Sequence, residues 1–260
     1  EPKAALVVGR IPLQDLAPTA LAATNWNGQV VLAVACGENI VICDLSGKYL
    51  KNIALSTITE VLTAFIDNNQ TLIGYSNGES INVYSLDKGE VIEKYQPPAV
   101  NSMITDLAIT QEYIFAADSK NRTIWQCERY DIEKGELQTE ACPIGSKQFV
   151  LPGAYFELVY KPGEDAIWAA NPGKHQLQRF QFNASEPDMS WGIASFELNG
   201  FSGCCNPASF DIFPDGRFIT SEKGALLVKL FSPEGKYIAL LADSHDLARP
   251  SAFKELTFPR

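Results

Sequence analysis

The chain has 260 residues, of which 46% are hydrophobic and 20% charged. A composition this apolar supports a sizeable core and excludes an intrinsically disordered protein. The net charge of −10 comes from 31 acidic and 21 basic residues, and the basic residues are scattered singly. A negative field without a basic patch repels a phosphate backbone, so we expect no nucleic-acid partner. No apolar run approaches the roughly 20 residues of a membrane-spanning helix, so we expect no transmembrane segment.

Short strand-like segments, separated by turns rich in glycine, asparagine, aspartate and proline, repeat one phrase of four strands five times along the chain. The first two units are predicted at Thr19–Thr24, Val30–Cys36, Ile40–Leu45 and Tyr49–Leu55, then at Val61–Ile66, Thr71–Tyr75, Ile81–Leu86 and Val91–Tyr95. The next two are predicted at Ile104–Ile109, Tyr113–Ala117, Thr123–Glu128 and Leu137–Ala141, then at Phe156–Tyr160, Ala166–Ala170, Gln176–Phe182 and Ile193–Leu198. The fifth is predicted at Ala208–Phe213, Arg217–Ser221, Leu226–Phe231 and Tyr237–Leu241.

A repeated four-strand phrase predicts an all-β fold, namely a β-propeller of four-stranded antiparallel blades forming a single domain over residues 1–260. One such sheet cannot cover both of its apolar faces, whereas radial repetition buries them and leaves only short edges. A β-sandwich does not predict the repeat. Two leftover strand-like fragments, Ala4–Leu13 and Phe253–Phe258, suggest a partial sixth blade built from both termini. A five-bladed ring with free ends is the alternative.

The fifth unit resembles an NHL repeat. The resemblance rests on Asn206–Thr220, with a proline before the inner strand and the turn Asp215-Gly216, and on Val228–Tyr237, with an aromatic residue before Pro233-Glu234-Gly235-Lys236. It implies a six-bladed propeller with a binding role, because NHL domains mostly bind proteins, nucleic acid or peptides. The acidic composition argues against the nucleic-acid branch.

Six cysteines and the start of the chain at Glu1, without a methionine, bear on the compartment. In a cytosolic protein such cysteines are buried thiols, and in an exported one they pair. We expect an exported protein: periplasmic, envelope-anchored or extracellular. There is no Cys-x-x-Cys spacing and there are only two histidines, so we expect neither a metal site nor another cofactor.

The adjacent cysteines Cys204 and Cys205 are the most unusual chemical feature of the sequence. A disulfide between neighbours strains the intervening peptide, and strained bridges are the labile, often functional ones. The alternative is that each thiol pairs elsewhere or is packed. The pair precedes a predicted inner strand, so we expect it beside the axial opening of the ring. The candidate ligand-binding residues are Cys204, Cys205, Asn206, Asn171, Glu222 and Lys223. For Glu222 and Lys223 a solvated turn is the alternative.

Two further cysteine pairs flank predicted hairpins. Cys127 and Cys142 are expected to form a structural disulfide if a bulge corrects their register, and Cys36 and Cys43 form either a bridge or a pair of buried thiols.

The function we predict is that of a non-enzymatic, monomeric propeller that binds a protein or a small molecule at its axial face, near Cys204-Cys205. A redox or metal-linked periplasmic protein that uses the two cysteines is the first alternative. A calcium-dependent hydrolase similar to the six-bladed lactonases is the second. No catalytic residue is assigned, because the hydrolase serine motif, the phosphate loop and the dinucleotide-binding glycine pattern are all missing.

Overall fold

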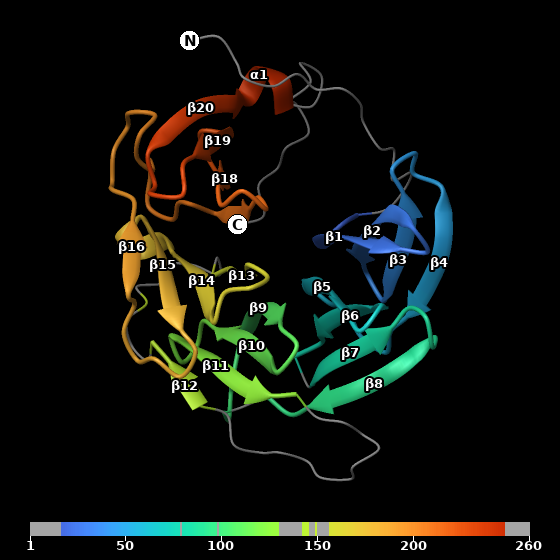
Figure 1. The fold of residues 1–260 in the computed structure, drawn as a ribbon. Coiled ribbons are helices and arrows are strands. Elements are labelled where there is room, and N and C mark those ends of the chain that lie inside the picture. Colours follow the sequence, from blue (N-terminus) through green and yellow to red (C-terminus); the bar gives the residue numbers. More distant parts are fainter. Residues whose placement is uncertain are drawn as a thin grey trace.

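A computed structural model describes residues 17–78, 80–97, 99–129, 142–145, 149 and 156–247. These residues form five four-stranded antiparallel sheets, arranged around a central axis as the blades of a propeller (Figure 1). Strand order within each sheet follows the chain, so strands that are consecutive in the sequence are neighbours in the blade. The all-β, bladed architecture expected from the repeat is therefore confirmed.

The strands of the five blades follow the predicted units closely. The first blade contains β1 (Ala20–Trp26), β2 (Gln29–Cys36), β3 (Asn39–Asp44) and β4 (Tyr49–Ala54), and the second β5 (Val61–Asp67), β6 (Gln70–Ser76), β7 (Ile81–Ser85) and β8 (Glu90–Tyr95). The third contains β9 (Ile104–Ile109), β10 (Tyr113–Asp118), β11 (Thr123–Glu128) and β12 (Cys142–Ile144), and the fourth β13 (Leu158–Tyr160), β14 (Ala166–Asn171), β15 (Gln176–Gln181) and β16 (Met189–Trp191). The fifth contains β17 (Ser209–Ile212), β18 (Phe218–Glu222), β19 (Leu227–Phe231) and β20 (Tyr237–Ala242). A 3₁₀ turn, Pro172–Lys174, and the short helix α1 (Ser244–Leu247) complete the described elements.

The core lies between the blades rather than inside any one of them. Four apolar clusters fill the spaces between the first and second, second and third, third and fourth, and fourth and fifth sheets. Phe115, Phe149, Phe156 and Phe180 are fully buried between the third and fourth sheets. Each buried phenyl ring contributes about 1.5–3 kcal/mol to stability. This packing explains why the middle strands are apolar on both faces.

Tight turns between strands depend on residues with positive φ. Gly47 and Gly89 join the third and fourth strands of their blades with φ of +85° and +80°. Glycine adopts positive φ with little strain, whereas other residues are strained there. The positions of these glycines in the sequence therefore mark where each third strand turns into the fourth.

Two outer strands differ from the predicted ones. The fourth blade ends with Met189–Trp191 instead of the predicted Ile193–Leu198. The Trp191 ring packs against Phe218 and Phe231, at centroid distances of 5.0 and 5.1 Å, whereas Phe196 is 95% exposed. The third blade ends with Cys142–Ile144, and the predicted Leu137–Ala141 lies outside the described residues.

The predicted terminal strands Ala4–Leu13 and Phe253–Phe258 also lie outside the described residues, so the partial sixth blade stays a prediction. The described blades number five, and the six implied by the NHL resemblance are not confirmed. None of the helices in the described ranges is long and apolar enough to span a membrane.

Candidate functional site in the axial cavity

The first strands of the five blades, β1, β5, β9, β13 and β17, surround the axis of the ring. Figure 1 shows β1, β5, β9 and β13 facing the middle, with β4, β8, β12, β16 and β20 outermost. Residues of all five first strands line a cavity of about 1390 Å³. This is at or above the upper end of the volumes typical of small-molecule sites, so the cavity is the natural candidate for ligand binding.

The charge of this cavity is one-sided. The acidic residues that line it are Glu60, Asp67, Asp106, Glu157 and Asp211, and no lysine, arginine or histidine lies among its described lining residues. The Asp67 carboxylate forms an ion pair with the Arg129 guanidinium, 2.8 Å away, which also pairs with Glu93. The other acids have no such ion pair among the described residues. The interior of the ring therefore repels anions and attracts cations.

Asp106 lies in β9 and links the third blade to the fourth. Its Oδ2 accepts the backbone N–H of Leu158 in β13 at 2.7 Å, and its Oδ1 accepts the N–H of Leu107 at 2.8 Å. Because β13 is an edge strand, its outward N–H groups have no strand partner, and a carboxylate satisfies one of them. Burial, and then the negative charge of Glu157, raises the pKa of Asp106 well above its usual range.

Glu157, directly before β13, repeats this arrangement one blade further on. Its Oε2 accepts the N–H of Phe210 in β17 at 3.1 Å, and Ser209 donates a side-chain hydrogen bond to the same carboxylate. Burial raises the pKa of Glu157 to about 7, although these two hydrogen bonds act to lower it. The negative charge of Asp211 adds to the increase. This carboxyl group therefore changes its protonation near neutral pH.

Asp211 in β17 completes the acidic row. Its Oδ1 accepts the N–H of Ile212 at 2.7 Å. Asp211 is exposed to solvent on the cavity wall, and desolvation by the surrounding residues raises its pKa. We call Asp106, Glu157 and Asp211 the axial carboxyl row. Three acids in or directly before the first strands of consecutive blades can accept hydrogen bonds from a cationic ligand, and a carboxyl with a pKa near 7 can donate or accept a proton.

The sequence prediction missed this row. The signal was present, because units three to five each place one acid inside a predicted inner strand that is otherwise apolar or neutral. An acid in an otherwise apolar or neutral inner strand indicates a side chain that faces the axial cavity rather than the core between blades.

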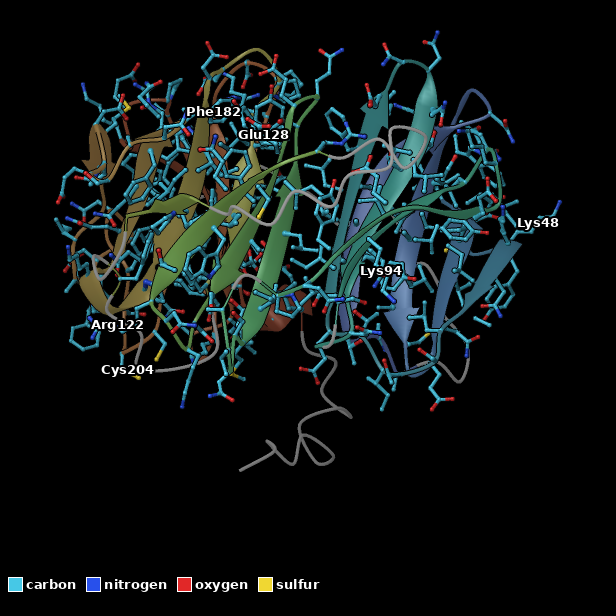
Figure 2. All side chains as sticks on the ribbon, turned by 90° about the horizontal axis from the view of Figure 1, so that it is seen from below. Lys48, Lys94, Arg122, Glu128, Phe182 and Cys204 are labelled. Atoms are coloured by element: carbon cyan, nitrogen blue, oxygen red, sulfur yellow. The ribbon has the colours of Figure 1, made fainter. Side chains whose placement is uncertain are left out.

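The predicted site residues gather at a different place. Cys204, Cys205 and Asn206 lie in the loop before β17, and Glu222 and Lys223 lie at the end of β18 beside that loop. Figure 2 shows Cys204 at one end of the ring, opposite the end that carries Glu128 and Phe182. None of these five is among the described residues that line the axial cavity. Their role in ligand binding stays a prediction.

The loop is held to β18 by side chains. The Asn206 amide donates to the carbonyls of Ser202 and Lys223, and its Oδ1 accepts the Lys223 N–H at 3.0 Å. The Glu222 Oε2 accepts the N–H of Ser202 at 2.8 Å and its hydroxyl at 3.0 Å. The other oxygen of Glu222 forms a fully buried ion pair with Lys229. Glu222 is thus a structural anchor rather than the residue of a solvated turn.

The sixth predicted contact, Asn171, is buried at the end of β14 and donates a hydrogen bond to Gln178 at 2.8 Å. The hairpin that follows Asn171 reaches the cysteine loop through His175, whose ring nitrogen contacts the Gly203 carbonyl. The structure thus brings five of the six predicted residues together at the cysteine loop and the end of β18. It places the sixth, Asn171, next to the neighbouring hairpin.

The cysteines are reduced where the structure describes both partners. The Cys204 and Cys205 sulfurs lie 3.3 Å apart, well beyond the bond length of about 2.05 Å, so the predicted vicinal disulfide is not formed. Cys36 and Cys43 are buried thiols, since the β2–β3 register pairs Cys36 with Asn39 and Cys43 with Leu32. Cys142 lies opposite Gln126, one residue from Cys127, and its side chain lies outside the described part, so the Cys127–Cys142 bridge stays a prediction.

Comparisons with known proteins support the fold. No protein-family model matches the chain, and no curated protein matches it in sequence. A protein of unknown function from Bacteroides caccae has a similar structure, with a TM-score of 0.63 and 13% identity over 90% of this chain and 84% of the other. Virginiamycin B lyase from Staphylococcus aureus is also similar, with a TM-score of 0.56 and 14% identity over 86% of this chain and 70% of the other. At these identities the likeness establishes a β-propeller fold.

Proposed function

We propose that this protein is a ligand-binding β-propeller whose axial cavity takes a small organic cation. The observation that carries the proposal is the axial carboxyl row, in a cavity whose described lining contains no basic side chain. A cationic ligand group supplies the positive counter-charge that the described cavity lining lacks. It also forms charge-assisted hydrogen bonds with the carboxylates.

An organic cation fits the cavity better than a metal ion. Among the described residues, no group of three histidine, cysteine or acidic side chains is placed to hold a metal. The volume of about 1390 Å³ admits a ligand of many atoms, and the rings of Phe65 and Tyr160, 6.5 Å apart, give its wall an aromatic surface. Aromatic faces and carboxylates together favour ammonium groups.

Binding of a cation is expected to depend on pH. Glu157 is mostly protonated at pH 5 and mostly ionised at pH 8, because its pKa is about 7. If the ligand needs the ionised carboxylate, its apparent affinity rises by up to about a hundredfold between these pH values. Binding also expels a proton near pH 7.

Isothermal titration calorimetry with benzylamine, benzyl alcohol and benzoate tests the proposal, because the three probes share a ring and differ in charge. We expect heat of binding from benzylamine alone, stronger at pH 8 than at pH 5, and lost in the Asp106→Asn/Glu157→Gln double variant. The matched control is Glu234→Gln, an exposed acid in the β19–β20 turn. Equal binding of benzyl alcohol would show an apolar pocket and refute the cation site.

An enzyme is the second candidate, favoured by one observation. Glu157 has a pKa of about 7 next to Asp106, whose pKa is also raised, and such pairs serve as general acids and bases. The fold it shares with a protein named virginiamycin B lyase makes an elimination a reasonable first reaction to assay. Turnover that survives Glu157→Gln would exclude this carboxyl as the base.

Export of the protein remains part of the proposal, tested by locating the native protein in cell fractions.

A further inference from the structure

The loop before β17 carries two thiols in unequal surroundings. Cys204 is exposed and Cys205 is buried, with 5% of its surface accessible. Their sulfurs are 3.3 Å apart, close enough for one thiol to donate a hydrogen bond to the other. An accessible thiol beside a protected one is the arrangement of a nucleophilic cysteine with its resolving partner.

A cation lies next to this pair. The Lys223 side chain forms a hydrogen bond with Cys205, and its charge favours the thiolate. Burial and the adjacent Cys204 act in the opposite direction and raise the pKa of the Cys205 thiol. The other polar side chains near the loop have partners of their own, since Glu222 pairs with Lys229 and the His175 ring contacts the Gly203 carbonyl. Lys223 is therefore the cation that offsets part of the cost of ionising Cys205.

The backbone around the pair is held on both sides. Asn206 forms three hydrogen bonds with the backbone of Ser202 and Lys223. The Glu222 carboxylate also accepts the N–H of Ser202. A fixed loop keeps the two sulfurs near each other and limits their reach to distant cysteines. Adjacent cysteines thus have each other as the available disulfide partner.

We propose that Cys204 and Cys205 form a reversible thiol–disulfide couple that reacts with low-molecular-weight disulfides of the glutathione class. The Cys204 thiolate attacks one sulfur of the small disulfide, forming a mixed disulfide and releasing one small thiolate. The Cys205 thiolate then attacks the Cys204 sulfur, closes the vicinal disulfide and expels the second small thiol. The two protein thiols lose two electrons and two protons in total, and the small disulfide is reduced to two thiols.

The couple is independent of the proposed cation site. None of Cys204, Cys205 and Lys223 is among the described residues that line the axial cavity. Failure of either proposal leaves the other unaffected, and the two assays use different probes.

The experiment incubates the native protein with graded ratios of reduced to oxidised glutathione, alkylates the remaining thiols and maps the peptides by mass spectrometry. We expect the Cys204–Cys205 peptide to become lighter by two hydrogen atoms and to escape alkylation, and to return to the dithiol form in excess reduced glutathione. Cys36 and Cys43, buried and out of register, are internal controls and should stay reduced.

Three variants resolve the order of steps. Cys205→Ser should accumulate one glutathione on Cys204, because nothing displaces it. Cys204→Ser should react at least tenfold more slowly, because only the buried thiol remains. Lys223→Met should slow ring closure severalfold without preventing it. Circular dichroism of each variant verifies folding. The proposal is overturned if both thiols stay alkylatable at every glutathione ratio, or if the wild-type protein stops at a mixed disulfide.

Discussion

Glu157→Gln is the most direct test of the electrostatics of the axial carboxyl row. Burial moves the pKa of this carboxyl from an ordinary 4.5 to about 7. Between these values the folded protein keeps a proton that the unfolded chain has released. Stability therefore falls as pH rises, by about 1.4 kcal/mol per pH unit, and the total loss above pH 7 is about 3 kcal/mol.

Glutamine has nearly the same shape, and its carbonyl oxygen can still accept the N–H of Phe210. It cannot ionise. We therefore expect Glu157→Gln to match the wild-type protein near pH 4.5 and to exceed its stability by up to about 3 kcal/mol at pH 8.

Urea unfolding, followed by the fluorescence of the four tryptophans, gives the free energy of unfolding at each pH. The control Glu234→Gln removes an exposed acid whose pKa is lowered by its hydrogen bond with Ser232, so it should keep the wild-type slope between pH 5 and 8. If Glu157→Gln also keeps that slope, the carboxyl does not titrate in this range and the reasoning about the row is wrong.

Two further predictions concern packing. Lys229→Met leaves the Glu222 carboxylate buried without its cation and should cost about 3–5 kcal/mol in urea unfolding. The double variant with Glu222→Gln should recover much of this loss, and no recovery would contradict the ion-pair explanation. Gly74→Ala places a methyl group 2.6 Å from the Ile109 side chain and should cost about 1–3 kcal/mol. Ile109→Val in the same protein should relieve part of it, and additive losses would refute the steric cause.

The repeat predicted the blades because its turns and strands are recognisable from local sequence alone, without tertiary contacts. Glycines such as Gly47 and Gly89 mark turns, and apolar runs such as Val30–Cys36 mark strands. The last strand of the fourth blade was misplaced because the apolar content of Ile193–Leu198 equals that of a true strand. Only the contacts with Phe218 and Phe231 show that Trp191 is the residue that packs against the fifth blade.

The site was harder to predict than the fold. Asp106, Glu157 and Asp211 lie in three separate units, and the side-by-side packing of the third, fourth and fifth blades brings them to one cavity. The sequence shows each acid in a predicted inner strand, but the desolvation and mutual charge effects that raise their pKa values come from the packing of the blades. The loop of Cys204 was predicted as a feature of interest, but its distance from the axis depends on how β17 enters its blade. Sequence reasoning therefore found an unusual local motif and missed a site assembled from several blades.

The tether between the cysteine loop and the buried Lys229 has a practical consequence for engineering. Peptides grafted into residues 202–207 would pull Glu222 away from its partner, and so would disturb the hydrophobic interior of the last two blades. The Asn27-Gly28 turn is the better place for an epitope or a fluorophore. Both residues are exposed, and an insertion beside Gly28 that keeps this glycine, whose φ is +76°, leaves the Glu222–Lys229 ion pair untouched.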